Sequence, residues 1–91
     1  MAHLAHDKKK LLDRVKRIRG QITGIEKAIE EERECGEVLL TLVACRGAMN
    51  SLMAEILEGH VRHHVLPQKN VDPEVQHAAD ELIEVIKRYL K

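Results

Sequence analysis

The chain has 91 residues, a formal net charge of zero and a single aromatic residue, Tyr89, with no Trp or Phe. A domain of this size buries only a modest core, so oligomerisation is an expected source of extra stability. Nothing in the sequence resembles a signal peptide or a transmembrane span, which argues against a secreted or membrane-embedded protein.

The composition favours an all-α domain. Ala, Leu, Glu and Lys dominate, and the only prolines are Pro67 and Pro73. A core of aliphatic side chains without rings suits close-packed helices. The two cysteines, in a chain without a secretory signal, are expected to be reduced thiols in the cytoplasm.

The neutral average hides an uneven charge distribution. Residues 1–24 hold seven Lys/Arg against two Asp/Glu, a local charge of +5. Residues 25–37 hold two against six, a local charge of −4. Such asymmetry raises the expectation of an anionic partner.

The first helix is predicted over residues 7–30, with Asp7 as its N-cap. Apolar residues alternate steps of four and three and so form one seam. The seam consists of Leu11, Val15, Ile18, Ile22, Ile25 and Ile29. An acidic run at residues 30–34 marks a short turn, after which the second helix should fold back antiparallel.

The second helix is predicted over residues 36–64 and is ended by Pro67. Its apolar face is broad, which predicts burial against more than one neighbour. That face consists of Val38, Leu39, Leu42, Cys45, Met49, Leu52, Met53 and Ile56. A third helix is predicted over residues 73–90, with Asp72 as N-cap and Pro73 in the first turn. Its apolar stripe is Val75, Ala79, Leu82, Ile86 and Tyr89.

A basic stripe runs beside the seam of the first predicted helix. Three lysines directly follow the N-cap, where cations oppose the helix dipole, and this local cost favours a role in binding an anion. Contact with nucleic acid would be mostly phosphate-directed and strongly salt-dependent. A solvated charged surface is the simpler alternative. The stripe consists of Lys10, Arg14, Arg17 and Gln21, flanked by Lys8, Lys9, Lys16 and Arg19, and Arg46 of the second helix can extend it.

Histidines cluster at the end of the second predicted helix. His60 and His64 are four residues apart and share a helix face, as paired metal ligands do. Histidines at a helix C-terminus also complement the dipole, so the pair alone is a weak signal. Cys35 is a third donor, but it lies 25 residues before His60, roughly 37 Å along a continuous helix. His63 either faces solvent or replaces His64 as a metal ligand.

An antiparallel dimer of the second helix would remove this separation. The midpoint between Cys35 and His60 falls at Gly47 and Ala48, with Ser51 close by. Small residues at a crossing point allow close approach of two backbones. The sequence therefore predicts a two-fold dimer in which Cys35 of one chain lies beside the histidines of the other.

Further donors are available at the N-terminus. Removal of Met1 is expected because Ala2 is small, which leaves a free amine on Ala2 next to the imidazole of His3, although a disordered terminus is an equal alternative. One thiolate with several nitrogens suits Ni(II), Co(II) or Zn(II). His6 is near enough to His3 to compete with it. Cys45 lies on the apolar stripe and is predicted to be a core thiol.

With these residues assembled, the chain resembles the CsoR/RcnR family of bacterial transcriptional repressors over nearly its whole length. The matching motifs are "RVKRIRGQITGIEKAIEE", "EC" at Glu34-Cys35, "ACRGAMNSLMAEILEGHV" and "IKRYLK". The resemblance implies a three-helix protomer, an antiparallel dimer and a disc-like homotetramer that binds double-stranded operator DNA when ligand-free and releases it on effector binding. It also implies a DNA-facing surface that includes Lys10, Arg14, Arg17, Gln21, Arg46 and the C-terminal Lys91.

The resemblance also bears on the effector. His3, Cys35, His60 and His64 match the pattern of the RcnR-like nickel/cobalt branch, whereas the copper branch would have cysteine at position 64. The FrmR-like formaldehyde branch shares Cys35 and usually has proline at position 2. Because Ala2 still offers a primary amine, a formaldehyde crosslink between Ala2 and Cys35 is the alternative hypothesis.

An enzyme is the remaining class to consider. A Cys/His pair can serve a thiol hydrolase. The sequence shows no pocket-forming loops, Gly-rich turn or carboxylate motif that would orient a base. We therefore expect no enzymatic activity.

Overall fold

The computed structural model describes residues 7–90, which fold into three long helices and one short π-helical turn. Residues 1–6 and 91 lie outside the described part of the chain. The all-α class and the three predicted helices are confirmed, except that a separate turn replaces the last part of the second helix. The elements are α2 (Lys8–Glu30), α3 (Cys35–His60), η1 (Val61–Val65) and α4 (Pro73–Tyr89).

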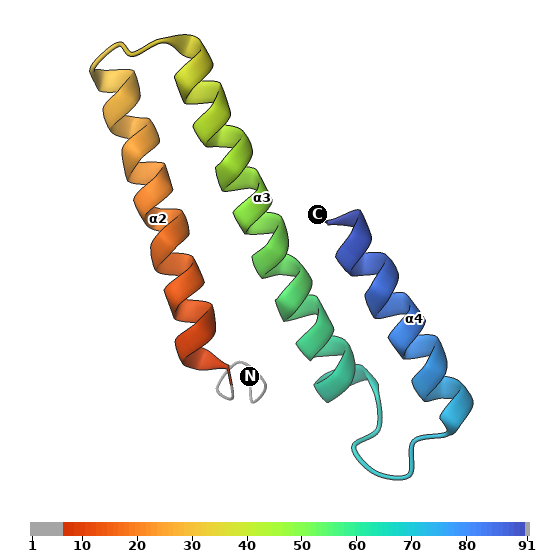
Figure 1. Ribbon diagram of the computed structural model, residues 1–91. Helices are drawn as coiled ribbons and strands as arrows, with labels where there is room; N and C mark the ends of the chain where they lie inside the picture. Colours follow the sequence, from red (N-terminus) through yellow and green to blue (C-terminus); the bar gives the residue numbers. More distant parts are fainter. Residues whose placement is uncertain (1–6, 91) are drawn as a thin grey trace.

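The helices α2 and α3 form an antiparallel hairpin, as the short acidic turn predicts (Figure 1). At the end of α2, Arg33 N donates to Ala28 O and Glu32 N donates to Ile29 O. This is the Schellman pattern, in which the residue after the helix adopts the left-handed conformation. Glu32 has φ 54° and occupies the position that usually holds glycine.

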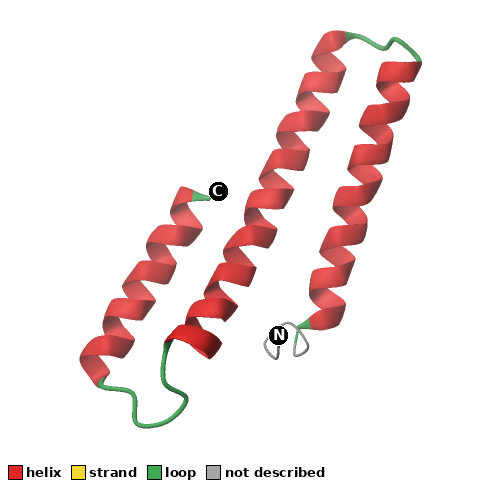
Figure 2. Ribbon diagram, turned by 180° about the vertical axis from the view of Figure 1, so that it is seen from behind, coloured by secondary structure: helices red, strands yellow, loops and turns green. Residues whose placement is uncertain are grey.

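The third helix, α4, returns along the C-terminal half of α3, on the side away from α2 (Figures 1 and 2). It begins as predicted, because Asp72 Oδ1 accepts a hydrogen bond of 2.8 Å from Glu74 N and Pro73 occupies the first turn. Asp7 precedes α2 as expected but makes no side-chain capping bond. The prediction of Asp7 as the N-cap residue is therefore confirmed by position, without the side-chain hydrogen bond that such a residue commonly accepts.

The three helices lie side by side in one layer. The chain measures 57 × 25 × 13 Å, and the smallest dimension is close to the diameter of one helix. Its radius of gyration is 17.3 Å, whereas a compact domain of this length has about 12 Å. A single layer leaves two opposite faces of α3 uncovered.

The buried core of the single chain is correspondingly thin. On α2 the predicted seam is only partly buried, because Val15, Ile22 and Ile29 are exposed. On α4, Ile83 is buried, while Leu82 and Tyr89 of the predicted stripe are exposed. Both predicted stripes are thus offset from the observed contact face, since each helix carries more apolar surface than one chain can cover. The buried side chains are Ile25, Cys45, Ala54, Ala79 and Ile83.

The helix α3 is apolar around most of its circumference. Several of its large side chains are exposed in the single chain, which fits the prediction that it needs more than one neighbour: Leu39, Leu40, Leu42, Val43, Met49 and Met53. By length and composition alone, Cys35–Val65 is also apolar enough to cross a membrane. The expectation that no membrane span is present did not take account of this stretch. One helix of this kind is weak support for a membrane span, because helices that other chains cover have the same composition.

Glu58 of α3 attaches α4 to the hairpin. Its carboxylate lies 2.9 Å from Lys87 Nζ on α4 and 3.2 Å from Arg62 Nε on η1. Arg62 continues the network, because its Nη1 lies 3.1 Å from Asp80 Oδ1 on α4. The hydrogen bond from Lys87, with a smaller contribution from Arg62, holds the pKa of Glu58 below its ordinary value of 4.5 against the opposing effect of burial.

Truncation of Ile83 tests the packing of α4. Ile83→Ala removes a side chain that is 2 % exposed and should lower the free energy of unfolding by about 2–4 kcal/mol. Glu81→Ala on the exposed side of the same helix should change it by less than about 0.5 kcal/mol. Chemical denaturation of both variants measures this, and equal losses would contradict the assigned orientation of α4.

The lowered pKa of Glu58 predicts a pH-dependent contribution to stability. Because the folded-state pKa is depressed, the stabilisation is complete above pH 4.5 and is lost as the pH falls through the folded-state value. Glu58→Gln should therefore lower the free energy of unfolding by about 1 kcal/mol at neutral pH. The difference from wild type should shrink as the pH falls below 4.5. If denaturation curves showed the same loss of unfolding free energy at every pH, the effect of Glu58→Gln would come from packing and not from charge. Glu84→Gln, at an exposed position of α4, is the control.

Candidate functional site

The histidine segment begins where α3 ends. His60 is the last residue of α3, and η1 continues the chain as a π-helical turn in which Leu66 N donates to Val61 O at 2.9 Å. Gln68 Nε2 donates to the carbonyl oxygens of Arg62 at 3.1 Å and His63 at 3.2 Å, which satisfies carbonyls that the end of the turn leaves open. Such π-helical turns occur often at functional sites.

This turn places His60 and His64 together. Their ring centroids are 5.3 Å apart, with an angle of 36° between the planes, and both residues are exposed. The two imidazoles can therefore approach a single ion from one face of the helix, as the four-residue spacing predicts. His63 instead lines a cavity of about 220 Å³ together with Asp7, Lys10 and Arg62.

The thiol of Cys35 lies at the other end of α3. Cys35 is the first residue of that helix and is exposed, whereas His60 is the last. Their separation of 25 residues is roughly 37 Å at 1.5 Å per residue. Among residues 7–90, no three His, Cys, Asp or Glu side chains of one chain are grouped so that they could hold a metal ion. The structure brings His60 and His64 together and leaves Cys35 apart from them.

The middle of α3 is open at the predicted crossing point. A Cβ added at Gly47 would meet no atom within 4 Å, and Ser51 is exposed. The side chain of Cys45 is buried at 3 % exposure, which confirms it as a core thiol. The proposed N-terminal donors Ala2 and His3, and the competing His6, lie outside the described residues.

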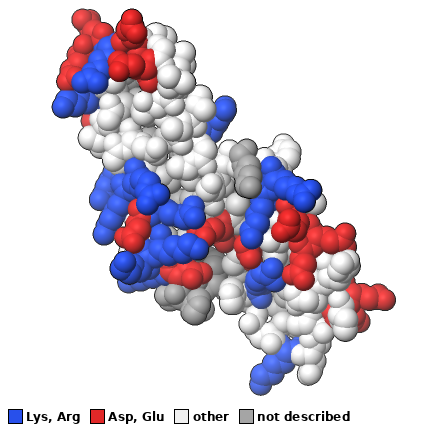
Figure 3. Space-filling view, viewed as in Figure 1, with Lys and Arg blue, Asp and Glu red and all other residues white. Residues whose placement is uncertain are grey.

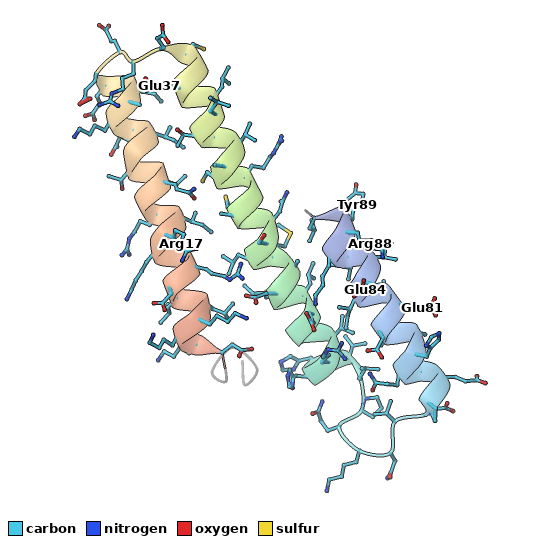
Figure 4. All side chains as sticks on the ribbon, viewed as in Figure 1. Arg17, Glu37, Glu81, Glu84, Arg88 and Tyr89 are labelled. Carbon is cyan, nitrogen blue, oxygen red and sulfur yellow. The ribbon has the colours of Figure 1, made fainter. Side chains whose placement is uncertain are left out.

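The basic residues gather on the N-terminal half of α2. Figure 3 shows Lys and Arg side chains over this half and acidic side chains at the α2–α3 turn. Arg17, labelled in Figure 4, is exposed and makes no ion pair within residues 7–90. Arg46 on α3 is also exposed, whereas Lys91 lies outside the described residues.

Two members of the predicted stripe contact an acidic side chain of α3. Glu55 Oε1 lies 2.8 Å from Lys10 Nζ, and Glu55 Oε2 lies 3.1 Å from Arg14 Nε. Gln21 is partly buried, and its Oε1 is buried without a hydrogen bond. Only Arg17 of the four stripe residues on α2 is thus both exposed and unpaired in the described part of the chain.

Sequence reasoning did not single out Glu55, Glu58, Arg62 or Gln68. The two glutamates interrupt an otherwise apolar helix three residues apart, which was an available signal. Their partners lie on other helices, and residue spacing within one helix does not reveal such contacts. Gln68 follows Pro67 in a segment that resembled an ordinary polar linker.

The chain is similar to known proteins in sequence and in fold. The family model described as metal-sensitive transcriptional repressor matches residues 7–88. The chain is 43% identical over its full length to an uncharacterised protein in the bioA 5′ region of Serratia marcescens, and 35% identical to the transcriptional repressor RcnR of Salmonella paratyphi B, with complete coverage of both. A variant of the formaldehyde-responsive regulator FrmR from Salmonella enterica serovar Typhimurium has a similar structure, with a TM-score of 0.66, 35% identity and coverage of 94% of this chain and 96% of that chain.

Proposed function

The chain belongs to the family of metal-sensitive transcriptional repressors, and we propose that it is a member that responds to Ni(II) or Co(II). Proteins of this family repress transcription and are not enzymes. The proposal is that the ligand-free protein binds operator DNA in the cytoplasm and that metal binding releases it. The observation that carries it is the pair of exposed imidazoles, His60 and His64, with their ring centroids 5.3 Å apart.

The donor set fits a borderline metal ion. Two imidazoles and one thiolate suit Ni(II), Co(II) and also Zn(II), whereas Cu(I) prefers more sulfur ligands. The amine of Ala2 and the imidazole of His3 would complete the coordination sphere. RcnR, the relative at 35% identity, is named as a transcriptional repressor, and the family model is described as metal-sensitive.

The site requires a second subunit. Since α3 holds Cys35 and His60 at its opposite ends, only an antiparallel copy of α3 can bring a thiol to the histidines. The exposed apolar residues of α3 and the open surface at Gly47 support such a dimer. Pairing of two dimers into a homotetramer would cover further exposed residues, among them Leu82 and Val85 of α4.

Release of DNA follows from this shared site. Ligation by Cys35 of one subunit and by His60 and His64 of the other fixes the position of two α3 helices relative to each other. Each α2 packs on an α3, so the basic stripes of the two subunits move as the helices are fixed. Coupling between such sites is typically about 1–3 kcal/mol, enough to change operator affinity between about fivefold and a hundredfold.

Formaldehyde is the second candidate effector. Cys35 is exposed, and a structurally similar protein is named as formaldehyde-responsive. The amine of Ala2 and the thiol of Cys35 would condense with one formaldehyde to give an N–CH₂–S bridge and one water. Mass spectrometry after formaldehyde treatment would then show a mass increase equal to one carbon atom, in a crosslinked peptide that contains Ala2 and Cys35. If no mass is gained and the protein binds metal, the metal is favoured as the effector.

A subunit-mixing experiment tests the shared metal site. Cys35→Ala and His60→Ala should each abolish the thiolate-to-metal charge-transfer absorption that Ni(II) or Co(II) gives with the reduced protein. Refolding an equal mixture should restore about a quarter of the wild-type signal, because half of the dimers are mixed and each of these keeps one intact site. A site within one chain would restore nothing, and a signal that persists in Cys35→Ala would remove the thiol from the site.

The DNA surface is tested at Arg17, which is exposed and makes no ion pair in the described part of the chain. Arg17→Ala should weaken binding to duplexes of any sequence and reduce the slope of log affinity against log salt by about 0.9. Lys27→Ala removes the same charge from the last turn of α2 and should leave the slope unchanged. Titrations by fluorescence anisotropy measure both slopes, and equal effects would place the DNA elsewhere.

A further inference from the structure

The carboxylate of Glu55 contacts two cations of the basic stripe, Lys10 and Arg14. Each of its oxygens faces one cation of α2, Oε1 at 2.8 Å from Lys10 Nζ and Oε2 at 3.1 Å from Arg14 Nε. The side chain of Glu55 is 27% exposed, and its Oε2, which faces Arg14, is buried without a hydrogen bond. The side chain of Lys10 is 62% exposed, so the Lys10 side of the contact is the side open to solvent. A carboxylate that pairs with two cations in this way has the same single negative charge, and the same kind of oxygen acceptors, as a phosphate of the DNA backbone.

Glu55 also lies between two cavities that are lined by basic residues. Glu55 lines the cavity that contains Lys10 and His63, and it also lines a second cavity of about 170 Å³ that contains Arg14, Ser51 and Lys87. Its charge lowers the net charge of the Glu55–Lys10–Arg14 group from +2 to +1. Within residues 7–90, Arg17 and Arg46 have no such partner.

We propose that Glu55 is an internal competitor for DNA phosphate, which pairs with Lys10 and Arg14 in the free protein and lowers their contribution to DNA binding. The proposal rests on the proposed DNA-binding function. Lys10 is exposed, and ion pairs of exposed side chains contribute little to stability, so a phosphate can displace the carboxylate from Lys10 while Arg14 keeps its contact with the buried oxygen. The displaced carboxylate remains close to the phosphate and repels it, which keeps the affinity low enough for an effector to reverse binding.

The opposite role makes the opposite prediction. If Glu55 held Lys10 and Arg14 in the orientation that DNA requires, its loss would weaken binding. The sign of the change in affinity therefore decides between competition and positioning.

The first experiment is Glu55→Gln, which keeps the shape of the side chain and removes its charge. Binding to a short mixed-sequence duplex at about 50 mM salt should become about fivefold tighter, and the gain should diminish towards 200 mM as salt screens the charge. Glu26→Gln on α2 removes the same charge from an exposed residue far from Lys10 and should change affinity less than twofold. Unchanged or weaker binding by a folded Glu55→Gln variant would overturn the proposal.

A second experiment keeps Glu55 in place and so does not depend on the folding of that variant. Because Lys10 is already partly neutralised, Lys10→Ala should weaken duplex binding less than Arg17→Ala does. An equal or larger loss at Lys10 would contradict competition. Wild-type protein that fails to bind the duplex at low salt would remove the DNA-binding function as well, whereas normal wild-type binding with no gain in Glu55→Gln removes this inference alone.

Discussion

The rigidity of one long helix determines how this protein can build a site. The helix α3 runs unbroken from Cys35 to His60 and contains no proline. Its backbone hydrogen bonds hold the two ends roughly 37 Å apart, and no side chain is long enough to span that distance. The exposed thiol of Cys35 and the paired imidazoles of His60 and His64 are therefore kept apart within one chain, and a metal site that used all three would have to be assembled from two chains.

The same helix organises the rest of the layer. It contacts α2 on one side and α4 on the other, and its acidic residues make the ion pairs to both: Glu55 to α2, and Glu58 to α4 and η1. These two residues are three positions apart, close to the histidine end. The ion pairs to the basic stripe, to α4 and to the histidine turn are consequently all made from the last third of α3, so a change in one of them lies close to the others.

Patterns within single helices were predictable from the sequence, and contacts between helices were not. Periodicity and the Asp72-Pro73 cap located the helices to within a few residues, and the spacing of His60 and His64 predicted their common face. The π-helical turn was not foreseen, and neither were the hydrogen bonds that Gln68 donates to the carbonyls of Arg62 and His63 within it, because helical spacing does not reveal them. The seam on α2 was placed too far to one side, because apolar periodicity does not distinguish a face covered within the chain from a face left open in one layer.

The positions of the charged residues and of the candidate metal donors along α3 also separate the two proposed tasks, metal binding and DNA binding. Cys35 lies beside the acidic turn, far from the basic stripe of its own chain, whereas His63 and Lys10 line the same cavity at the other end. In an antiparallel pair, the acidic end of each subunit would approach the histidine end of its partner. Each shared site would then be built next to the cations of the chain that supplies the histidines. Closing the proposed site would change the surroundings of Lys10 and Arg14, because Glu55, which pairs with both, is only five residues before His60 on α3.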